Sequence, residues 1–183
     1  FSTENWNRPK LEVQTLMKLL ISSLKKEIKT LQENNIKLNC IGNITKLPTT
    51  AQKQLLEVME KTKTNSRMTL TLALSYGSRE EIVQAVKSIS DKVKNNIIST
   101  DDIDEVIINQ HLYTQNLPDV DLLIRTSGET RISNFLLWQI AYAELYFTNV
   151  LWPDFREQDL YNAIADYQKR ERRFGKISEQ IKI

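Results

Sequence analysis

Hydrophobic residues recur at helical spacing over the first part of the chain. Pro9 suits the start of a helix, and the apolar positions that follow it are Val13, Leu16, Met17, Leu20, Leu24, Ile28 and Leu31. Residues three and four apart share one helix face, so this stripe predicts one long amphipathic helix. Similar spacing predicts helices at Thr50–Lys63, Glu80–Lys94, Asp101–Asn109 and Asp159–Arg173, and a helical turn at Ser133–Trp138.

Short apolar or alternating runs lie between these helices. They predict strands at Ile36–Ile41, Met68–Ser75, Val120–Arg125 and Glu144–Phe147. Because helix and strand signals alternate, we expect an α/β fold with a largely parallel sheet flanked by helices. The 183 residues hold only four glycines and four prolines and no linker-like tract, so we expect a single domain over residues 1–183.

Composition and charge narrow the class of protein. The net charge of +2 is too small to indicate a nucleic-acid-binding protein. Cys40 is the only cysteine, which rules out an intrachain disulfide and fits a reducing, cytoplasmic compartment. No apolar run approaches the roughly 18 residues of a membrane span. Neither a P-loop nor a G-x-G-x-x-G nucleotide motif occurs in the sequence.

Polar clusters accompany the predicted strand ends. Ser75–Gly77 and Arg125–Glu129 each follow a strand, and Phe1–Asn5 precedes the first helix as a strand end would. Ligands of parallel sheets bind beyond the carboxyl ends of the strands. We therefore expect these clusters to lie on one rim of the sheet.

The cluster before the first helix has two interpretations. Ser2, Thr3 or Asn5 could cap that helix, and on chemistry alone this structural role is favoured. A cap does not explain why Trp6 and Arg8 stand beside these residues, so a substrate site is the alternative.

The cluster around Gly128 contains Arg125, Arg131 and Ser133. Guanidinium groups bind phosphate oxygens through paired donors, so two arginines after a strand suit a diphosphate. A helix starting near Ser133 would add free backbone N–H groups. The pattern equally allows both arginines to pair with Glu129 and other surface acids.

Glu144 stands in the run from Trp138 to Phe147, which is otherwise almost uncharged. An unpaired buried charge is costly, so this carboxylate should have a partner. The partner is either an arginine, the commoner arrangement, or a hard cation such as Mg²⁺.

Three further features are interpreted as structural. The acids of Asp101–Glu105 faintly resemble a metal motif, but they stand at a helix start, where acids are expected. His111 has no companion histidine. The cations between Lys169 and Lys176 suit the carboxyl end of the last helix, with contact to phosphate or an anionic membrane surface as the minor alternative.

Long segments of the chain resemble signature blocks of the cis-prenyltransferase family, of the undecaprenyl diphosphate synthase type. They are Phe1–Pro9 (FSTENWNRP), Asp121–Gln139 (DLLIRTSGETRISNFLLWQ), Ala143–Phe155 (AELYFTNVLWPDF) and Arg170–Gly175 (RERRFG). Because the matches are long and occur in order along the whole chain, they are far more specific than a lone short motif.

The resemblance implies an enzyme that condenses isopentenyl diphosphate onto an allylic diphosphate such as farnesyl diphosphate. The product would be undecaprenyl diphosphate, the lipid-carrier precursor of bacterial cell-wall glycans. The resemblance also implies Mg²⁺ as cofactor, a homodimer, and an apolar tunnel lined by the first helix and the neighbouring strands. Peripheral contact with the inner face of the membrane stays open.

Site residues follow from the same resemblance. Asn5 matches the catalytic residue described as a proton acceptor, although a neutral amide is a very poor base and its oxygen suits orienting a group. Glu144 matches the Mg²⁺ ligand. Arg173 and Gly175 match an element that reaches the partner subunit's site. The implied substrate-binding residues are Ser2, Thr3, Glu4, Trp6, Arg8, Arg125, Arg131, Ile132 and Ser133.

One family segment is absent from these residues, the Asp-Gly-Asn-Gly-Arg block that carries the catalytic aspartate. Together with Phe1 in place of Met, this leads us to expect an amino-terminally truncated chain that lacks the first strand and is inactive alone. A noncatalytic partner subunit of a heteromeric prenyltransferase is the alternative, and retention of Asn5, Arg125, Arg131 and Glu144 argues against it. An RNA- or phosphate-binding module is a third interpretation, which the near-neutral charge disfavours.

Overall fold

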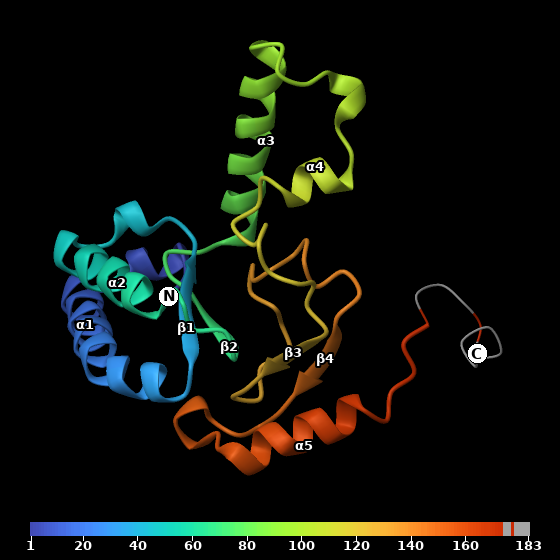
Figure 1. Cartoon of the computed structure of the whole chain (residues 1–183). Coiled ribbons are helices and arrows are strands. Elements are labelled where there is room, and N and C mark those ends of the chain that lie inside the picture. The colour runs from blue at the N-terminus through green and yellow to red at the C-terminus, as the bar shows by residue number, and fades with distance from the viewer. Residues whose placement is uncertain (174–176, 178–183) are drawn as a thin grey trace. The chain divides into compact units, whose positions relative to one another are not determined.

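The computed structural model describes residues 1–173 and 177 (Figure 1). The chain divides into two compact units, residues 1–116 and residues 117–183. The expectation of a single domain stays a prediction. The first unit contains η1 (Glu4–Asn7), α1 (Lys10–Glu33), β1 (Ile36–Ile41), α2 (Thr49–Thr62), β2 (Met68–Ala73), α3 (Ser78–Lys94) and α4 (Glu105–Asn109). The second contains β3 (Leu122–Arg125), β4 (Glu144–Phe147) and α5 (Glu157–Tyr167).

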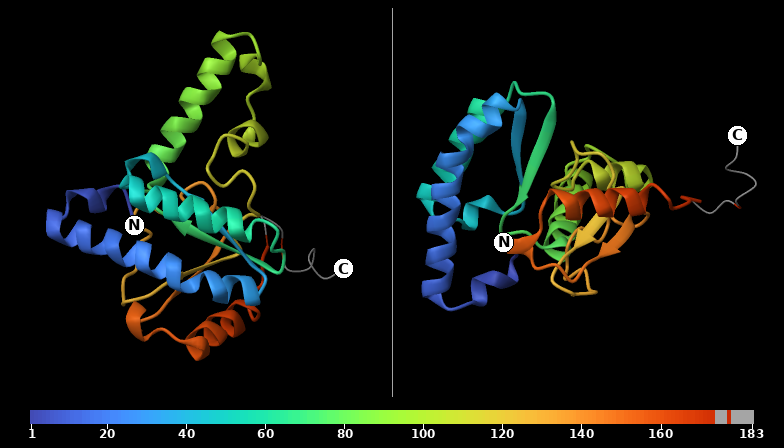
Figure 2. Two further views of the ribbon diagram at one scale, coloured as in Figure 1. Left: turned by 60° about the vertical axis from the view of Figure 1, so that its left-hand side comes forward. Right: turned by 90° about the horizontal axis from the view of Figure 1, so that it is seen from below.

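The first unit is built on a parallel pair of strands. β1 and β2 pair in register from Ile36 opposite Met68 to Ile41 opposite Ala73. Helices α1 and α2 lie side by side against this pair, as Figures 1 and 2 show. The expected parallel α/β arrangement is confirmed.

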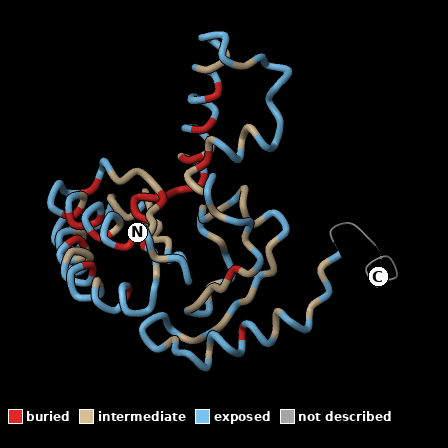
Figure 3. Tube along the Cα trace, viewed as in Figure 1, coloured by how far each residue is buried: buried red, intermediate tan, exposed pale blue. Residues whose placement is uncertain are grey.

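The core of this unit follows the apolar stripe of the sequence. Met17, Leu24 and Leu31, seven residues apart on α1, are buried together with Leu55 and Val58 of α2. Figure 3 shows the buried positions of both helices among exposed turns. Because replacing a buried leucine by alanine typically costs about 2–5 kcal/mol, this stripe contributes much of the unit's stability.

Gly42 allows the chain to leave β1 close to β2. Its φ is +105°, a conformation that side chains rarely adopt. A Cβ atom at this position would lie 2.3 Å from the backbone oxygen of Leu74. Only glycine therefore permits this close approach at the carboxyl end of the strand pair.

The second unit contains a shorter parallel pair. β3 and β4 run in register from Leu122 opposite Glu144 to Arg125 opposite Phe147. Helix α5 lies beside β4 (Figure 1).

Two expectations for this unit are wrong. Ser133–Trp138 forms no helical turn, because Ser133, Asn134 and Leu136 have φ of 50°, 61° and 52°, which interrupts right-handed helix geometry. Helix α5 ends at Tyr167 rather than at Arg173. Beyond it the chain turns so that Arg170 reaches Glu144 at the start of β4 and Arg172 reaches Asp121 just before β3.

In the described part of the chain, no helix combines the length and apolar character that a membrane crossing requires.

Candidate active site

The first residues of the chain run beside the carboxyl end of β2. Ser2 forms a parallel bridge with Tyr76. The backbone N–H of Thr3 donates to the Tyr76 oxygen (3.0 Å), and the N–H of Tyr76 donates to the Phe1 oxygen (3.2 Å). The N–H of Asn43, just after β1, donates to the Ser75 oxygen (3.1 Å). Within the first unit, the expected gathering of polar segments at one rim is confirmed.

Asn5 and Trp6 fix the loop that precedes α1. The Oδ1 atom of Asn5 accepts a hydrogen bond from the Ser2 backbone N–H (2.8 Å). The indole Nε1 of Trp6 donates to the Ser75 hydroxyl (2.9 Å), and its ring stands edge-on to Phe1 at 4.8 Å. This loop is therefore attached to the rim by side-chain as well as backbone contacts.

The capping interpretation of this loop is wrong. Pro9 occupies the N-cap position of α1, and no side chain caps that helix. Proline supplies a fixed φ, here −50°, that suits the entry to the helix. The side chains of Ser2, Thr3 and Asn5 are thus not used to start α1.

Two charged side chains of the loop make exposed contacts. The Thr3 hydroxyl donates to Glu4 Oε2 (3.1 Å). Arg8 Nη1 pairs with Glu12 Oε1 at 2.6 Å, and both side chains are about half exposed. An exposed pair of this kind contributes only about 0–1 kcal/mol. Arg8 can therefore exchange Glu12 for a stronger anionic partner at little cost.

An apolar pocket of about 560 Å³ lies along α1 and the strand pair. Asn5 and Arg8, which precede α1, contribute polar groups to its lining near the loop. Most of the remaining lining is hydrophobic: Phe1, Leu16, Met17, Leu19, Leu20, Leu24, Leu31, Leu38, Leu70, Leu72 and Leu74, with Ser23 and Glu27 also present. A long apolar molecule with an anionic head matches this distribution.

A buried carboxylate that the sequence did not single out supports the rim. Glu81 is 1% exposed; its Oε2 accepts from the Tyr76 hydroxyl (2.6 Å) and its Oε1 from the Tyr113 backbone N–H (2.8 Å). Burial, and then the nearby carboxylates of Glu80 and Glu81, raise the pKa of Tyr113. Acids are common in the first turn of a helix, so the sequence carried no signal of this burial.

Arg125 ends strand β3 in the second unit. Its Nε is buried and has no hydrogen-bond partner among the residues that the structure describes. The following turn is fixed by backbone bonds from Ser127 to Val150 (2.8 Å) and from Gly128 to Thr148 (2.9 Å). The guanidinium group of Arg125 therefore has donor capacity left for an anion.

Arg131, Ile132 and Ser133 follow this turn. Arg131 pairs with Glu129, so the surface-pair interpretation holds for Arg131, whereas Arg125 makes no hydrogen bond or ion pair with Glu129. The Ile132 oxygen accepts the Phe135 N–H (3.2 Å), and Ser133 is exposed in a left-handed conformation. No helix begins at Ser133, so the free backbone N–H groups that a helix start would present to a phosphate are not found there.

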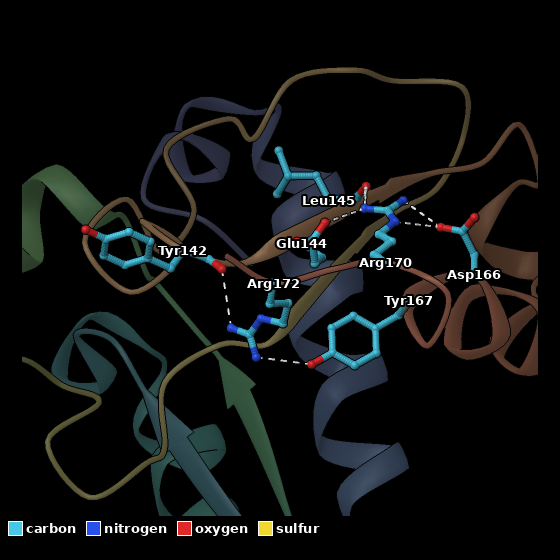
Figure 4. Close-up of polar contacts among 7 residues, drawn as sticks. All are labelled: Tyr142, Glu144, Leu145, Asp166, Tyr167, Arg170 and Arg172. Atoms are coloured by element: carbon cyan, nitrogen blue, oxygen red, sulfur yellow. Dashed lines mark hydrogen bonds and ion pairs between the residues drawn. The ribbon is translucent and has the colours of Figure 1, made fainter. Parts of the chain in front are cut away.

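Glu144 begins strand β4, at the opposite end of the strand pair from Arg125. Three residue steps separate the two positions along the sheet, which is about 10 Å. The structure thus does not bring Arg125 and Glu144 together at one end of this sheet. Of the two partners expected for Glu144, an arginine is present: Oε2 accepts from Arg170 Nη1 at 2.9 Å (Figure 4).

Whether Glu144 could bind Mg²⁺ depends on Oε1, the carboxylate oxygen that Arg170 does not occupy. Its Oε1 makes no hydrogen bond to a described residue, and the side chain is 27% exposed. Within residues 1–173 and 177, no group of three or more His, Cys, Asp or Glu side chains could hold a metal alone. Glu144 therefore fits Mg²⁺ as one ligand, an arrangement in which substrate phosphates and water supply the others.

The arginines near the end of the described chain are paired with acids. Besides Arg170, Arg172 binds Asp121 and the Tyr167 hydroxyl (3.1 Å), and Arg173 binds Glu171 (3.1 Å). None lies in the last turn of α5, so the helix-dipole explanation is wrong. Gly175 and Lys176 lie outside the described residues.

The acids of Asp101–Glu105 have the structural role that the sequence predicted, at the starts of helices. Ser99 and Asp102 form a capping box, and Asp104 caps α4 by accepting the Ile107 N–H (2.8 Å). His111 Nδ1 lies 2.6 Å from the Ile107 oxygen within the same region.

Comparison with known proteins agrees with this geometry. Residues 1–175 match the prenyltransferase family described as undecaprenyl diphosphate synthase. An isoprenyl transferase of Chlorobaculum tepidum is 53% identical over 182 residues, which cover all of this chain and 69% of that protein. A ditrans,polycis-undecaprenyl-diphosphate synthase, (2E,6E)-farnesyl-diphosphate specific, of Pasteurella multocida is 51% identical and covers 98% of this chain and 75% of its own length.

A solved structure shares the fold. Lavandulyl diphosphate synthase of Lavandula x intermedia, in complex with dimethylallyl diphosphate, superposes with a TM-score of 0.93 at 41% identity. The match covers 96% of this chain and 76% of that structure. With the sequence blocks, the parallel α/β fold and the family match in agreement, the chain belongs to the undecaprenyl diphosphate synthase family of prenyltransferases.

Proposed function

We propose that this protein is a cis-prenyltransferase that adds isopentenyl diphosphate units in sequence onto farnesyl diphosphate to make undecaprenyl diphosphate. The observation that carries this proposal is the pocket beside α1, in which Asn5 and Arg8 stand near one end of a largely leucine-lined surface. The substrate has the same division, because a diphosphate head is joined to a hydrocarbon tail. Each buried CH₂ group of the tail would contribute about 0.8 kcal/mol.

The reaction forms one carbon–carbon bond in each cycle. The C4 atom of isopentenyl diphosphate bonds to C1 of the allylic chain while the C1–O bond breaks and diphosphate leaves with the electron pair. A proton is then lost from C2 of the isopentenyl unit, which creates the new double bond. The departing diphosphate, which gains charge during this step, is the natural acceptor for that proton.

The residues of this chain would act chiefly by electrostatics and orientation. Arg125 offers an unsatisfied donor for the diphosphate of isopentenyl diphosphate, and donors that are already in place need no reorganisation during reaction. Arg131 and Ser133 would add exposed donors, with the Ile132 backbone between them. Asn5 has its oxygen occupied by the Ser2 N–H, so its Nδ2 is the group available to orient a phosphate oxygen. Ser2, Thr3, Glu4 and Trp6 would shape the loop around the allylic head.

Mg²⁺ belongs to the same proposal, with Glu144 as its ligand. When bound, the ion would neutralise charge on a diphosphate. A homodimer, and a cytoplasmic location with peripheral contact at the membrane, are also proposed, and they rest on the family resemblance rather than on a contact in the structure.

The test is turnover of the full-length protein with labelled isopentenyl diphosphate and farnesyl diphosphate, with the products separated by chain length. We expect polyprenyl diphosphates up to the undecaprenyl product. Replacing Leu20 by tryptophan inside the pocket should shorten them, while replacing the exposed Leu11 in the same way should not. A full-length protein with no turnover alone, restored by a second polypeptide, would favour the noncatalytic partner-subunit alternative.

A further inference from the structure

Arg170 lies between two carboxylates (Figure 4). Its Nη1 donates to Glu144 Oε2 (2.9 Å) and to the Leu145 backbone oxygen (3.0 Å). Its Nε and Nη2 both donate to Asp166 Oδ2, at 2.9 and 2.6 Å. Asp166 belongs to the last turn of α5, and Glu144 begins β4. Arg170 therefore attaches the segment after α5 to the start of the strand.

This cluster contains two carboxylates but only one guanidinium group. Glu144, Arg170 and Asp166 together carry one net negative charge. An arginine guanidinium stays charged in proteins, so the positive charge beside Glu144 is fixed. A divalent cation at the free oxygen of Glu144 would lie across the same carboxylate from this fixed positive charge, at about 6 Å, and like charges at that distance repel even in water.

We infer that Arg170 sets the affinity of Glu144 for a divalent cation by competing with that cation for the carboxylate. Arg170 is thus a positioning residue that acts through Glu144. This inference rests on the proposed function, in which Glu144 holds Mg²⁺. Because coupling between two ligands of one site is reciprocal, Mg²⁺ should also loosen the attachment of residues 168–173 to β4.

Asp166 gives the inference a second, opposite test. It shares Arg170 with Glu144, and its replacement by asparagine would leave Glu144 as the main anionic partner of the guanidinium. The competition for Glu144 would then increase. Loss of Arg170 and loss of Asp166 should therefore change Mg²⁺ affinity in opposite directions, which general damage to the fold would not do.

Arg172 provides a matched control from the same segment. It donates to the Tyr167 hydroxyl (3.1 Å) and to the Tyr142 oxygen (3.4 Å) rather than to Glu144 (Figure 4). It also pairs with Asp121. Replacing it removes a second anchor of the segment but leaves the charge next to Glu144 unchanged.

The experiment titrates the full-length protein with Mg²⁺ alone by calorimetry and follows amide hydrogen exchange of residues 168–173 with and without the ion. We expect Arg170→Gln to bind Mg²⁺ about ten-fold more tightly, the size of a +1/+2 repulsion at about 6 Å when it is screened as in bulk water. Asp166→Asn should bind several-fold more weakly. Arg170→Lys, which keeps the charge, should stay near wild type, as should Arg172→Gln. In the wild type, Mg²⁺ should speed exchange in the segment.

Two results would overturn the inference, and they differ. If Glu144→Gln abolishes Mg²⁺ binding while Arg170→Gln and Asp166→Asn leave it unchanged, Arg170 does not compete and the proposed Mg²⁺ ligand stands. If Glu144→Gln binds Mg²⁺ as the wild type does, Glu144 is not the ligand, and both the assignment and the inference fail.

Discussion

The two units differ in how far the polar groups at their strand ends are hydrogen-bonded. At the end of β1–β2, the groups are paired within the unit: Trp6 with Ser75, Asn5 with Ser2, and Tyr76 with the buried Glu81. At the end of β3, Arg125 keeps a buried Nε without a hydrogen-bond partner among the described residues.

This difference separates stability from ligand binding. A net intramolecular hydrogen bond contributes about 0.5–1.5 kcal/mol, whereas a buried group left unsatisfied costs about 1–3 kcal/mol. A protein keeps such a costly group where function requires it. Disruption of the first rim should therefore lower stability in addition to any effect on substrate binding, whereas loss of Arg125 should lower activity without lowering stability.

The largest effect is expected from Arg125→Gln. The proposed diphosphate contact is lost, so kcat/KM for isopentenyl diphosphate should fall about 100- to 1000-fold, as when one preorganised donor is removed from an active site. The free energy of unfolding should be unchanged or slightly higher, because a buried unsatisfied donor disappears. Steady-state kinetics and urea unfolding of the full-length protein measure the two quantities.

Arg125→Lys is the control for charge alone. Lysine lacks the planar fork of donors, so it should recover only a small part of the activity. A clear loss of stability in Arg125→Gln would contradict the comparison, since it would mean that Arg125 holds the fold.

A smaller effect, on stability, is expected from Glu81→Gln. The charged acceptor of the Tyr76 hydroxyl and the Tyr113 N–H is replaced by an amide, and bonds to charged groups are worth about 1.5–3 kcal/mol. We expect the free energy of unfolding to fall by about 2 kcal/mol, measured by urea denaturation. The neighbouring Glu80→Gln breaks only a partly exposed pair with Lys46 and should cost less than about 1 kcal/mol. Equal losses in both variants would count against a special role for the buried rim.

The sequence predicted the regular elements because their patterns are local. Strands β1 and β4 have the predicted bounds, Ile36–Ile41 and Glu144–Phe147. The end of α5 was not predictable from a local pattern, since it accompanies ion pairs between residues 26 and 51 positions apart in the chain, Arg170 with Glu144 and Arg172 with Asp121. The left-handed turn at Ser133–Leu136 contains no glycine to mark it.

For the candidate site, the sequence predicted which residues matter but not which partners they have. Chemistry alone left the partners of Arg125, Arg131 and Glu144 open, and the resemblance of long segments supplied their roles. The partners themselves depend on tertiary contacts. Glu81 shows the limit most clearly, because a glutamate in a first helical turn is usually exposed and only packing against Tyr76 and Tyr113 makes it a buried anchor.

The smallest effect is expected at Cys40 and appears only at high pH. Burial raises the pKa of the Cys40 thiol from 9.0 to about 11. Between these values the unfolded chain loses the proton while the folded chain keeps it, so the unfolded state binds fewer protons and stability falls as pH rises. Near pH 7 both states are protonated and no contribution remains. Cys40→Ala should therefore show a flatter decline of unfolding free energy between pH 9 and 11 than the wild type, whatever its stability at pH 7. Identical slopes would mean that water reaches β1 freely, and the first unit would then be less closed than its paired rim indicates.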